Sequence, residues 1–460
     1  MIGAGYVGLV TAACFGEKGH QVTCVDIVAE RVEALRRGEV PIQEPGLAEL
    51  WDKHLESGAL EVTDSHSLGM RDCDFIFICV GTPSMQDGST DLAQVVSAAR
   101  SVADHANGNP IVVVKSTVPP GTADRLAKIV NADRSSPNLI HVVSNPEFLR
   151  EGEAVADFLN PDRVILGAAD RSSAEAVGAL YARLTCPVVF CDNATAEMVK
   201  YASNAFLATK ISFINEIASL CEPFNVEVND VARGMGMDHR IGAHFLKAGL
   251  GWGGSCLPKD ISALAAMARE SRVPSPLLDS VFEVNSKIPS AVATKLDRLL
   301  GGLERRTVGV WGLTFKPGTD DLRESPAVML ADLLVNAGCA VKAYDPAVNQ
   351  SGSEPVRAVN YCANPYEAAQ DSDAVILATA WEEFLSVDMA RVREEMRGNV
   401  FFDARNAFDP RHLKDLGFAY LAIGRDGIVG ERAVQVNGYS QTKEPELISR
   451  RRKQLSARGG

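Results

Sequence analysis

The chain has 460 residues, a formal net charge of −13 at pH 7, 46% hydrophobic residues and 23% charged residues. This length accommodates two or three domains with ample buried core, and the composition is ordinary for a globular protein. The acidic balance argues against nucleic acid or an anionic membrane as a partner, because both require a basic surface.

The cysteines and the apolar runs indicate the compartment. The ten cysteines have no close paired spacing, which favours reduced thiols and a cytoplasmic protein. No run reaches the roughly 18–20 apolar residues of a transmembrane helix. The first sixteen residues lack the positive start and the cleavage site of a signal peptide. We therefore expect neither a membrane span nor secretion.

Strand-like and helix-like segments alternate over the first part of the chain, which predicts an α/β architecture with a parallel sheet. A helix is expected from residue 8 to about residue 20, followed by a strand over residues 21–26. Later apolar runs have the character of strands buried on both faces; they lie at residues 74–80, 111–115 and 139–143. Ligands bind outside the carboxyl ends of such strands, so the loops that follow them are expected to border a site.

The glycines at the start of the chain have the spacing of a dinucleotide-binding loop. Gly3, Gly5 and Gly8 form G-x-G-x-x-G, a loop that normally follows a β-strand. Asp26 ends the next predicted strand, where a carboxylate can bind both ribose hydroxyls and repel a 2′-phosphate, which favours NAD over NADP. Arg31 is equally suited to an adenosine phosphate or to solvent.

Only two residues precede this loop, so its strand is missing from the pattern. We expect the first strand to be truncated in this chain. The natural start would then lie upstream by roughly five or six residues, the length of a strand.

The pattern becomes helical near residue 195. A long helix is predicted from Thr195, as N-cap, to about residue 222, and further helices follow to about residue 300. A second α/β unit follows, with apolar runs at residues 307–312, 341–345, 374–378 and 399–403. The predicted architecture is two Rossmann-like doubly wound domains, 1–194 and 301–430, joined by a central helical domain, 195–300. The polar residues 431–460 are predicted to be a disordered tail.

Two further stretches carry candidate chemistry. Cys256 lies in a glycine-rich loop and is followed by Lys259 and Asp260; a nearby ammonium and backbone amides would stabilise its nucleophilic thiolate. The alternative is a surface loop with an incidental thiol. Lys200 and Asn204, four residues apart, share one face of the long helix. A buried lysine with a lowered pKa could act as a base and the amide could hold an oxyanion, whereas an isolated pair of this kind is more often exposed.

Five ordered motifs together resemble the UDP-glucose/GDP-mannose dehydrogenase family of nucleotide-sugar dehydrogenases. They occupy residues 3–8, 116–121, 144–152, 253–260 and 315–326. The resemblance implies an NAD-binding domain, a helical dimerisation domain and a C-terminal nucleotide-binding domain, and hence a homodimer or larger homo-oligomer. It implies oxidation of UDP-glucose at C6 to the carboxylate with two NAD, through a thiohemiacetal and a thioester on Cys256. GDP-mannose, or another nucleotide sugar, is the alternative substrate.

The resemblance also assigns residues to roles. Lys200 and Asn204 would stabilise charge on the oxygen at C6, with Lys200 also a candidate base. Thr117, Glu147 and Asp260 would place or activate water. The implied catalytic residues are Thr117, Glu147, Lys200, Asn204, Cys256 and Asp260. The expected cofactor residues are Gly3, Gly5, Tyr6, Val7, Gly8, Asp26, Arg31, Thr82, Thr117, Glu151, Lys259 and Arg323. The expected substrate residues are Glu147, Phe148, Leu149, Arg150, Lys200, Asn204, Arg240, Gly253, Phe315, Lys316 and Arg405, with Arg240 reaching the partner's substrate. No metal is expected.

Two other classes of function compete with this interpretation. A two-electron hydroxyacid dehydrogenase can carry Lys200 and Asn204 on a helix, but it has no use for Cys256. A non-catalytic sensor of NAD or of a nucleotide sugar would not need Cys256, Lys200 and Asp260 together.

Overall fold

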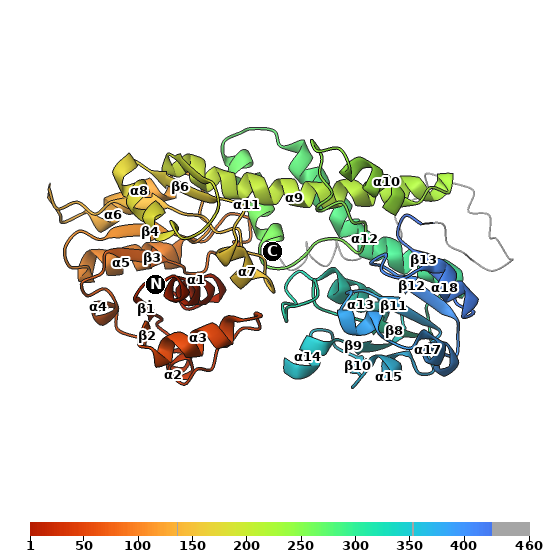
Figure 1. Ribbon diagram of the computed structural model, residues 1–460. Coiled ribbons are helices and arrows are strands. Elements are labelled where there is room, and N and C mark those ends of the chain that lie inside the picture. Colours follow the sequence, from red (N-terminus) through yellow and green to blue (C-terminus); the bar gives the residue numbers. More distant parts are fainter. Residues whose placement is uncertain (136, 352–353, 426–460) are drawn as a thin grey trace, which may run out of the picture. The chain divides into compact units, whose positions relative to one another are not determined.

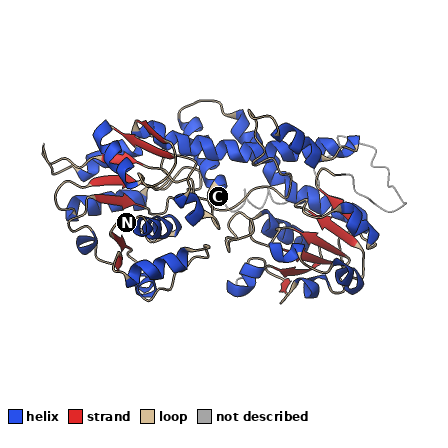
Figure 2. Ribbon diagram, in the orientation of Figure 1, coloured by secondary structure: helices blue, strands red, loops and turns tan. Residues whose placement is uncertain are grey.

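The computed structural model describes residues 1–135, 137–351 and 354–425. The predicted tail, 431–460, lies outside these residues. Figures 1 and 2 show two sheet-containing parts and a set of longer helices. No helix of the described residues is both long and apolar enough to cross a membrane. All ten cysteines are free thiols.

The N-terminal part contains seven short strands among the described residues, and two of them, β1 and β3, flank the opening residues of the chain. Their bounds are β1 (Val22–Val25), β2 (Leu60–Thr63), β3 (Phe75–Ile78), β4 (Ile111–Val114), β5 (Val142–Ser144), β6 (Val164–Ala168) and β7 (Val188–Cys191). β1 pairs with β2, and the other five follow in the order β3-β4-β5-β6-β7.

Ile2 joins these two groups of strands. It forms parallel bridges to Val25 of β1 and to Ile78 of β3. Its N–H donates to the Phe77 carbonyl (2.7 Å), and its carbonyl accepts from the Cys79 N–H (2.8 Å). The order β2-β1-Ile2-β3-β4-β5 corresponds to the doubly wound order 3-2-1-4-5-6. Met1 and Ile2 therefore hold the central position where the sequence predicts a truncated first strand.

One strand pair departs from the expected parallel arrangement. β5 and β6 are antiparallel, whereas β6 and β7 are parallel to each other. The connection from β5 to β6 contains only the short helix α7 (Ala154–Leu159). The connection from β5 to β6 therefore lies at the carboxyl ends of the parallel strands β3–β5. Ligands bind at this end of the sheet in such folds.

Helices cover both faces of the N-terminal sheet (Figure 1). One core packs against α1 and α3 and includes Leu9, Phe15 and Trp51, and the second packs against α5 and α6 and includes Val102 and Leu126. The helices are α1 (Tyr6–Glu17), α2 (Ala29–Arg36), α3 (Leu47–Glu56), α4 (His66–Gly69), α5 (Ala93–His105), α6 (Thr122–Val130) and α8 (Arg171–Leu180).

The middle of the chain is helical, as predicted. It comprises α9 (Asn193–Cys221), the 3-10 helix η1 (Glu222–Phe224), α10 (Val228–Gly236), α11 (Leu257–Glu270) and α12 (Pro276–Leu300). The predicted N-cap, Thr195, is wrong. Asp192 caps α9 by accepting from the Thr195 N–H (2.8 Å), because an aspartate three residues earlier reaches the free N–H groups of the first turn.

The C-terminal part is a second doubly wound unit in which every strand pair is parallel. Its strand order, β10-β9-β8-β11-β12-β13, is again 3-2-1-4-5-6. The strands are β8 (Thr307–Trp311), β9 (Ala340–Tyr344), β10 (Val359–Tyr361), β11 (Ala374–Leu377), β12 (Val400–Asp403) and β13 (Ala419–Ala422). The helices are α13 (Pro326–Asn336), α14 (Pro346–Ser351), α15 (Pro365–Ala369), α16 (Glu382–Leu385), α17 (Met389–Glu395) and α18 (Pro410–Asp415).

The opening glycines differ in how closely they are packed, which gives a test of the fold. A Cβ on Gly8 would lie 1.9 Å from the Gly3 carbonyl oxygen, whereas a Cβ on Gly5 meets nothing within 4 Å. Gly8→Ala should therefore destabilise the protein by about 1–3 kcal/mol through overpacking. Thermal unfolding of the variants measures this. Gly5→Ala is the matched control and should melt close to the wild type; equal melting temperatures for the two variants would contradict the close approach at Gly8.

Candidate active site

The glycine-rich loop and Asp26 form one end of the site. The Asp26 carboxylate is buried and accepts from the Ala4 N–H (2.8 Å) and the Val28 N–H (3.0 Å). It thereby fixes the loop to the end of β1. Gly5 is the N-cap of α1 and has no side chain to occupy the space before the helix. Open space in front of unpaired helix N–H groups suits a diphosphate.

Arg31 and Tyr6, both expected cofactor residues, contact other residues of the protein near the loop. Arg31 pairs with Asp26 (3.0 Å). The Tyr6 hydroxyl donates to Glu44, and both groups accept from the Gly152 N–H. The Tyr6 side chain thus joins the glycine-rich loop to the loop after β5.

Lys200 and Glu147 form a buried ion pair of 2.9 Å. Burial opposes both charges. The Glu147 and Asp260 carboxylates nevertheless raise the pKa of Lys200 above its ordinary value. Lys200 and the Leu149 N–H in turn lower the pKa of Glu147 despite its burial. The expected lowered pKa of Lys200 is therefore wrong, because the lysine faces carboxylates rather than an apolar pocket. A raised pKa favours the ammonium form of Lys200.

Asn204 and Asp260 extend this group. Asn204 Nδ2 donates to Asp260 Oδ2 (2.6 Å), and Lys259 Nζ lies 2.5 Å from Asp260 Oδ1. Asn204 and Lys200 lie on the same buried face of α9, as their spacing predicts. The Lys259 ammonium is thus paired with the Asp260 carboxylate and is not an unpaired cation beside Cys256.

Cys256 is the N-cap of α11 and lies beside the ion pair. Burial and the Glu147 carboxylate raise the pKa of the Cys256 thiol to about 11, although Lys200 opposes them. The expected stabilisation of the thiolate is therefore wrong, because burial and the Glu147 and Asp260 carboxylates outweigh the effect of Lys200. Cys256 is a protonated thiol in this state.

The glycines before Cys256 are required by close packing. A Cβ on Gly253 would lie 2.3 Å from the Glu324 carbonyl oxygen, and one on Gly254 would lie 2.8 Å from the Phe315 ring. Gly254 also has a φ of +83°, which favours glycine. This loop therefore rests directly on the C-terminal part, and Phe315 fixes its position. Lys316, the next residue, is largely buried, which lowers its pKa.

Glu151 and Arg323 also meet beside the cysteine. The Ser255 hydroxyl donates to Glu151 Oε1 (2.9 Å), and Arg323 lies 3.6 Å from the same oxygen. Arg323 is held at 2.7 Å by Asp321. Burial and the nearby Asp321 carboxylate raise the pKa of Glu151 to about 7.

Arg405 is a partly buried cation whose guanidinium has no carboxylate partner among the described residues. Its guanidinium donates to the carbonyls of Ala378 (2.5 Å), Gly251 and Phe315 (both 3.4 Å). Burial lowers its pKa to about 10. A guanidinium that contacts only carbonyl oxygens suits an anionic ligand.

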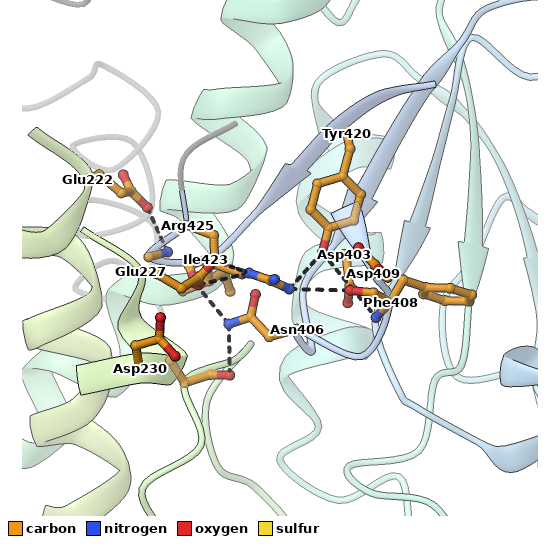
Figure 3. Close-up of polar contacts among 12 residues, drawn as sticks. Glu222, Glu227, Asp230, Asp403, Asn406, Phe408, Asp409, Tyr420, Ile423 and Arg425 are labelled. Carbon is orange, nitrogen blue, oxygen red and sulfur yellow. Dashed lines mark hydrogen bonds and ion pairs between the residues drawn. The ribbon is translucent and has the colours of Figure 1, made fainter. Parts of the chain in front are cut away.

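A second layer of polar contacts holds the turn that carries Arg405 (Figure 3). Asp403 accepts from the Arg405 N–H (3.1 Å) and from the Tyr420 hydroxyl (3.0 Å). Arg425 contacts Tyr420 and pairs with Glu227 next to α10 (2.8 Å). The Arg405 turn is thereby connected to the central helices.

The remaining predicted residues differ in position. Thr82 and Thr117 are buried in the loops after β3 and β4. Phe148 lies 5.3 Å from Lys200 Nζ, with Leu149 beside it in the chain. Arg150 is instead turned outward onto Asp157 and Glu153. The exposed Arg240 pairs with Asp238, outside this cluster. The described residues contain no group of His, Cys, Asp and Glu side chains placed to hold a metal.

Sequence reasoning missed several residues around the site. Arg163 stacks on the Phe148 ring at 3.6 Å, and Lys115 donates to Asn145 (3.2 Å) with a pKa that burial lowers to about 8. Glu197 lies one turn before Lys200, a spacing that could have revealed it. Glu44 has no comparable signal, because its partners are more than thirty residues away in the sequence.

Comparisons with known proteins agree with this arrangement. Family profiles match the NAD binding domain at residues 1–185, the central domain at 194–287 and the UDP binding domain at 309–410, all of the UDP-glucose/GDP-mannose dehydrogenase family. The chain is 45% identical to the UDP-glucose 6-dehydrogenase of Pseudomonas aeruginosa over 92% of this chain and 97% of that protein.

Solved structures show the same relationship. A UDP-glucose dehydrogenase from Pyrobaculum islandicum matches with a TM-score of 0.85 and 39% identity, over 92% of this chain and 96% of the other. A ternary complex of GDP-mannose dehydrogenase from Pseudomonas aeruginosa matches with a TM-score of 0.51 and 29% identity, over 92% and 98%.

These matches account for the cofactor and for the class of reaction. NAD is the cofactor, and the space before Gly5 together with the Asp26 carboxylate fits its diphosphate and ribose. The protein is an NAD-dependent dehydrogenase, and the chain belongs to the UDP-glucose/GDP-mannose dehydrogenase family.

Proposed function

We propose that this protein oxidises UDP-glucose to UDP-glucuronate with two NAD, through a covalent intermediate on Cys256. The observation that carries the proposal is the buried cluster of a thiol, an ammonium and two carboxylates formed by Cys256, Lys200, Glu147 and Asp260. The names of the Pseudomonas aeruginosa and Pyrobaculum islandicum relatives support UDP-glucose. GDP-mannose is the weaker candidate, because the match to that dehydrogenase is less close.

Cys256 divides a four-electron oxidation into two easier steps. Oxidation of the C6 alcohol gives an aldehyde, to which the Cys256 sulfur adds as its proton leaves. The resulting thiohemiacetal is oxidised to a thioester, and water cleaves it to the carboxylate and the free thiol. NAD, when bound, supplies the hydride acceptor for both oxidations.

Lys200 and Asn204 are the proposed contacts to the oxygen at C6. The ammonium donates to this oxygen as negative charge develops on it, in a buried setting where such a hydrogen bond is strong. Since Lys200 is already protonated, the role of base passes to Glu147 or Asp260, with Thr117 placing water. Each carboxylate is held by its own partners, Leu149 and Lys259 respectively.

The cofactor would be held by the loop of Gly3, Gly5 and Gly8, with Tyr6 and Val7 opening α1. Asp26 would bind the ribose hydroxyls. Other proposed cofactor contacts are Arg31, Thr82, Thr117, Glu151, Lys259 and Arg323. Arg31 lies on α2 and Lys259 in the first turn of α11, and the other four lie on loops.

Local cations explain how an acidic protein binds an anionic substrate. Arg405 and Lys316 are partly buried, Arg405 contacts the Phe315 carbonyl, and neither cation has an ion-pair partner among the described side chains. We propose that they bind the diphosphate or sugar, together with the loop that includes Phe148, Leu149 and Arg150. The functional domains are proposed as 1–194, 195–300 and 301–430. The free cysteines suit a cytoplasmic protein.

We further propose a homodimer that forms through α9. Phe206, Phe213 and Leu220, seven residues apart, are 64%, 44% and 54% exposed on this helix. Seven-residue spacing places them on one stripe, and an exposed apolar stripe typically marks a protein interface. Arg240 lies in the loop after α10 and would reach the partner's substrate.

Turnover of UDP-glucose should yield two NADH per sugar, because both oxidations occur before product leaves. GDP-mannose, assayed beside it, should react much more slowly.

Cys256→Ser should lower steady-state NADH production by at least about 10³-fold, as removal of a covalent nucleophile does. Calorimetry should still detect binding of UDP-glucose and of NAD to this variant. Cys186→Ser, which changes a thiol outside the cluster, is the matched control. Unchanged NADH production in Cys256→Ser would contradict the mechanism.

The raised pKa of Cys256 predicts a pH-dependent reactivity. In the free enzyme, alkylation of Cys256 by iodoacetamide should rise about tenfold per pH unit from pH 7 toward its pKa of about 11, because only the thiolate reacts. Mass spectrometry of the Cys256 peptide measures the rate, with glutathione as reference. Lys200→Met removes the cation that favours the thiolate and should slow alkylation at pH 9. A rate that is already constant at pH 7–8 would show a resting thiolate instead.

The proposed dimer can be tested by charge insertion. The double variant Phe206→Asp and Phe213→Asp should be monomeric in light scattering coupled to size exclusion, because two carboxylates would have to be buried in the interface. Leu385→Asp, at an equally exposed apolar position on α16, is the control and should remain dimeric. A wild type that is monomeric, or a double variant that is still dimeric, would rule out this interface.

A further inference from the structure

Glu197 is a buried carboxylate that none of the roles described so far uses. It lies in the first turns of α9, three residues before Lys200, and is almost completely buried. Three and seven residues separate it from Lys200 and Asn204, so all three side chains project from one face of the helix. This places Glu197 directly behind the catalytic cluster.

The partners of Glu197 belong to two separate loops. Its Oε2 accepts from the Gly121 N–H (2.6 Å), and its Oε1 accepts from the Ala123 N–H (2.8 Å) and the Ser144 hydroxyl (3.1 Å). Gly121 ends the loop that carries Thr117 after β4. Ser144 ends β5, three residues before Glu147. A single carboxylate therefore connects the catalytic helix to the loops of Thr117 and Glu147.

These contacts replace a local helix cap. Gly121 is the N-cap of α6 and has no side chain that could accept from the first-turn N–H groups. Glu197 supplies the acceptor from a position more than seventy residues away in the sequence. A nearby serine or aspartate usually provides such a cap. The distant cap has a consequence that a local one lacks: the position of the loop depends on the position of α9.

We propose that Glu197, as a carboxylate, is a positioning residue that holds the Thr117 and Glu147 loops against Lys200. This inference rests on the catalytic roles proposed above. The ionised group offers two acceptor oxygens to three donors. A protonated Glu197 can donate its O–H to the Ser144 hydroxyl, but the protonated oxygen is a poor acceptor for the Ala123 N–H, so the contact to α6 weakens and the loop moves away from α9.

The charge environment makes this contact sensitive to pH. All three donors are neutral, and no lysine, arginine or histidine forms an ion pair with Glu197 among the residues that the structure describes. Burial and the Asp124 carboxylate on α6 raise the pKa of Glu197 to about 7. Tyr201, the other titratable neighbour, lies on α9 itself, and burial keeps its pKa high. Glu197 therefore changes charge near neutral pH.

The test is kcat as a function of pH in the full-length enzyme, after the two-NADH stoichiometry of the wild type has been established. The wild-type kcat should rise through about pH 7 as Glu197 ionises. Glu197→Gln should lower kcat by about 10–10²-fold, the cost of misplacing catalytic groups by about 1 Å, and should lose this acid limb. The KM values for UDP-glucose and NAD should change much less than kcat.

Two further variants separate positioning from simple loss of stability. Asp124→Asn removes the repelling charge, so the acid limb should move to lower pH with kcat at its plateau preserved. Glu197→Asp keeps the charge but is shorter, so it should retain the limb at a reduced kcat. These two variants decide the matter if Glu197→Gln does not fold. Glu175→Gln, on the exposed face of α8, is the matched control and should behave as the wild type.

The position of the loop before α6 can also be measured without substrate. Amide hydrogen exchange of a peptide covering residues 119–126, corrected for its intrinsic pH dependence, should lose protection below pH 7 in the wild type and at all pH values in Glu197→Gln. A Glu197→Gln enzyme with wild-type kcat, limb and protection would overturn the inference, as would an unmoved limb in Asp124→Asn. A wild type that makes no NADH from UDP-glucose would instead overturn the proposed function.

Discussion

The buried pair between Lys200 and Glu147 governs the electrostatics of this site. Burying two charges is expensive, and removing one partner of such a pair typically costs 3–5 kcal/mol, because the other charge is left uncompensated. The pair is nevertheless kept, and its charges set the behaviour of its neighbours: Glu147 disfavours the Cys256 thiolate while Lys200 favours it. Burial acts in the same direction as Glu147, so the pKa of the thiol lies above its ordinary value despite Lys200.

The pair also requires that several loops meet accurately. Lys200 comes from α9, Glu147 from the loop after β5, and Cys256 from the start of α11. The loop before Cys256 packs on Phe315 and Glu324 of the C-terminal part through glycines that leave no room for a side chain. Arg405 donates to the carbonyls of Gly251 and Phe315 in the same region. The loop before Cys256 and the Arg405 guanidinium are therefore held by contacts to the same segment around Phe315.

Much of the fold could be predicted from the sequence, because the elements of the doubly wound units are indicated by residues that are close together in the chain. Short apolar strands, Asp26 after the first full strand, and the four-residue spacing of Lys200 and Asn204 all depend on neighbours close in the chain. The structure confirms the α/β fold class, and it places Lys200 and Asn204 on one buried face of α9. The pKa values of Lys200 and Cys256 could not be predicted in the same way, because their signs depend on Glu147 and Asp260, which are distant in the sequence. The roles of individual site residues stay predictions.

The central positions of the two sheets are occupied by segments of different length. In the C-terminal unit β8 supplies five residues to the centre of the sheet, whereas in the N-terminal unit the corresponding position holds Met1 and Ile2. The hydrogen bonds of Ile2 to Phe77 and Cys79, and of Gly3 to Val25, satisfy both neighbouring strands where the glycine-rich loop begins. A central strand aims this loop only through its last residues, since they set the direction in which the chain enters α1. The two opening residues provide that direction, and Asp26 fixes the loop from the other side through the Ala4 N–H.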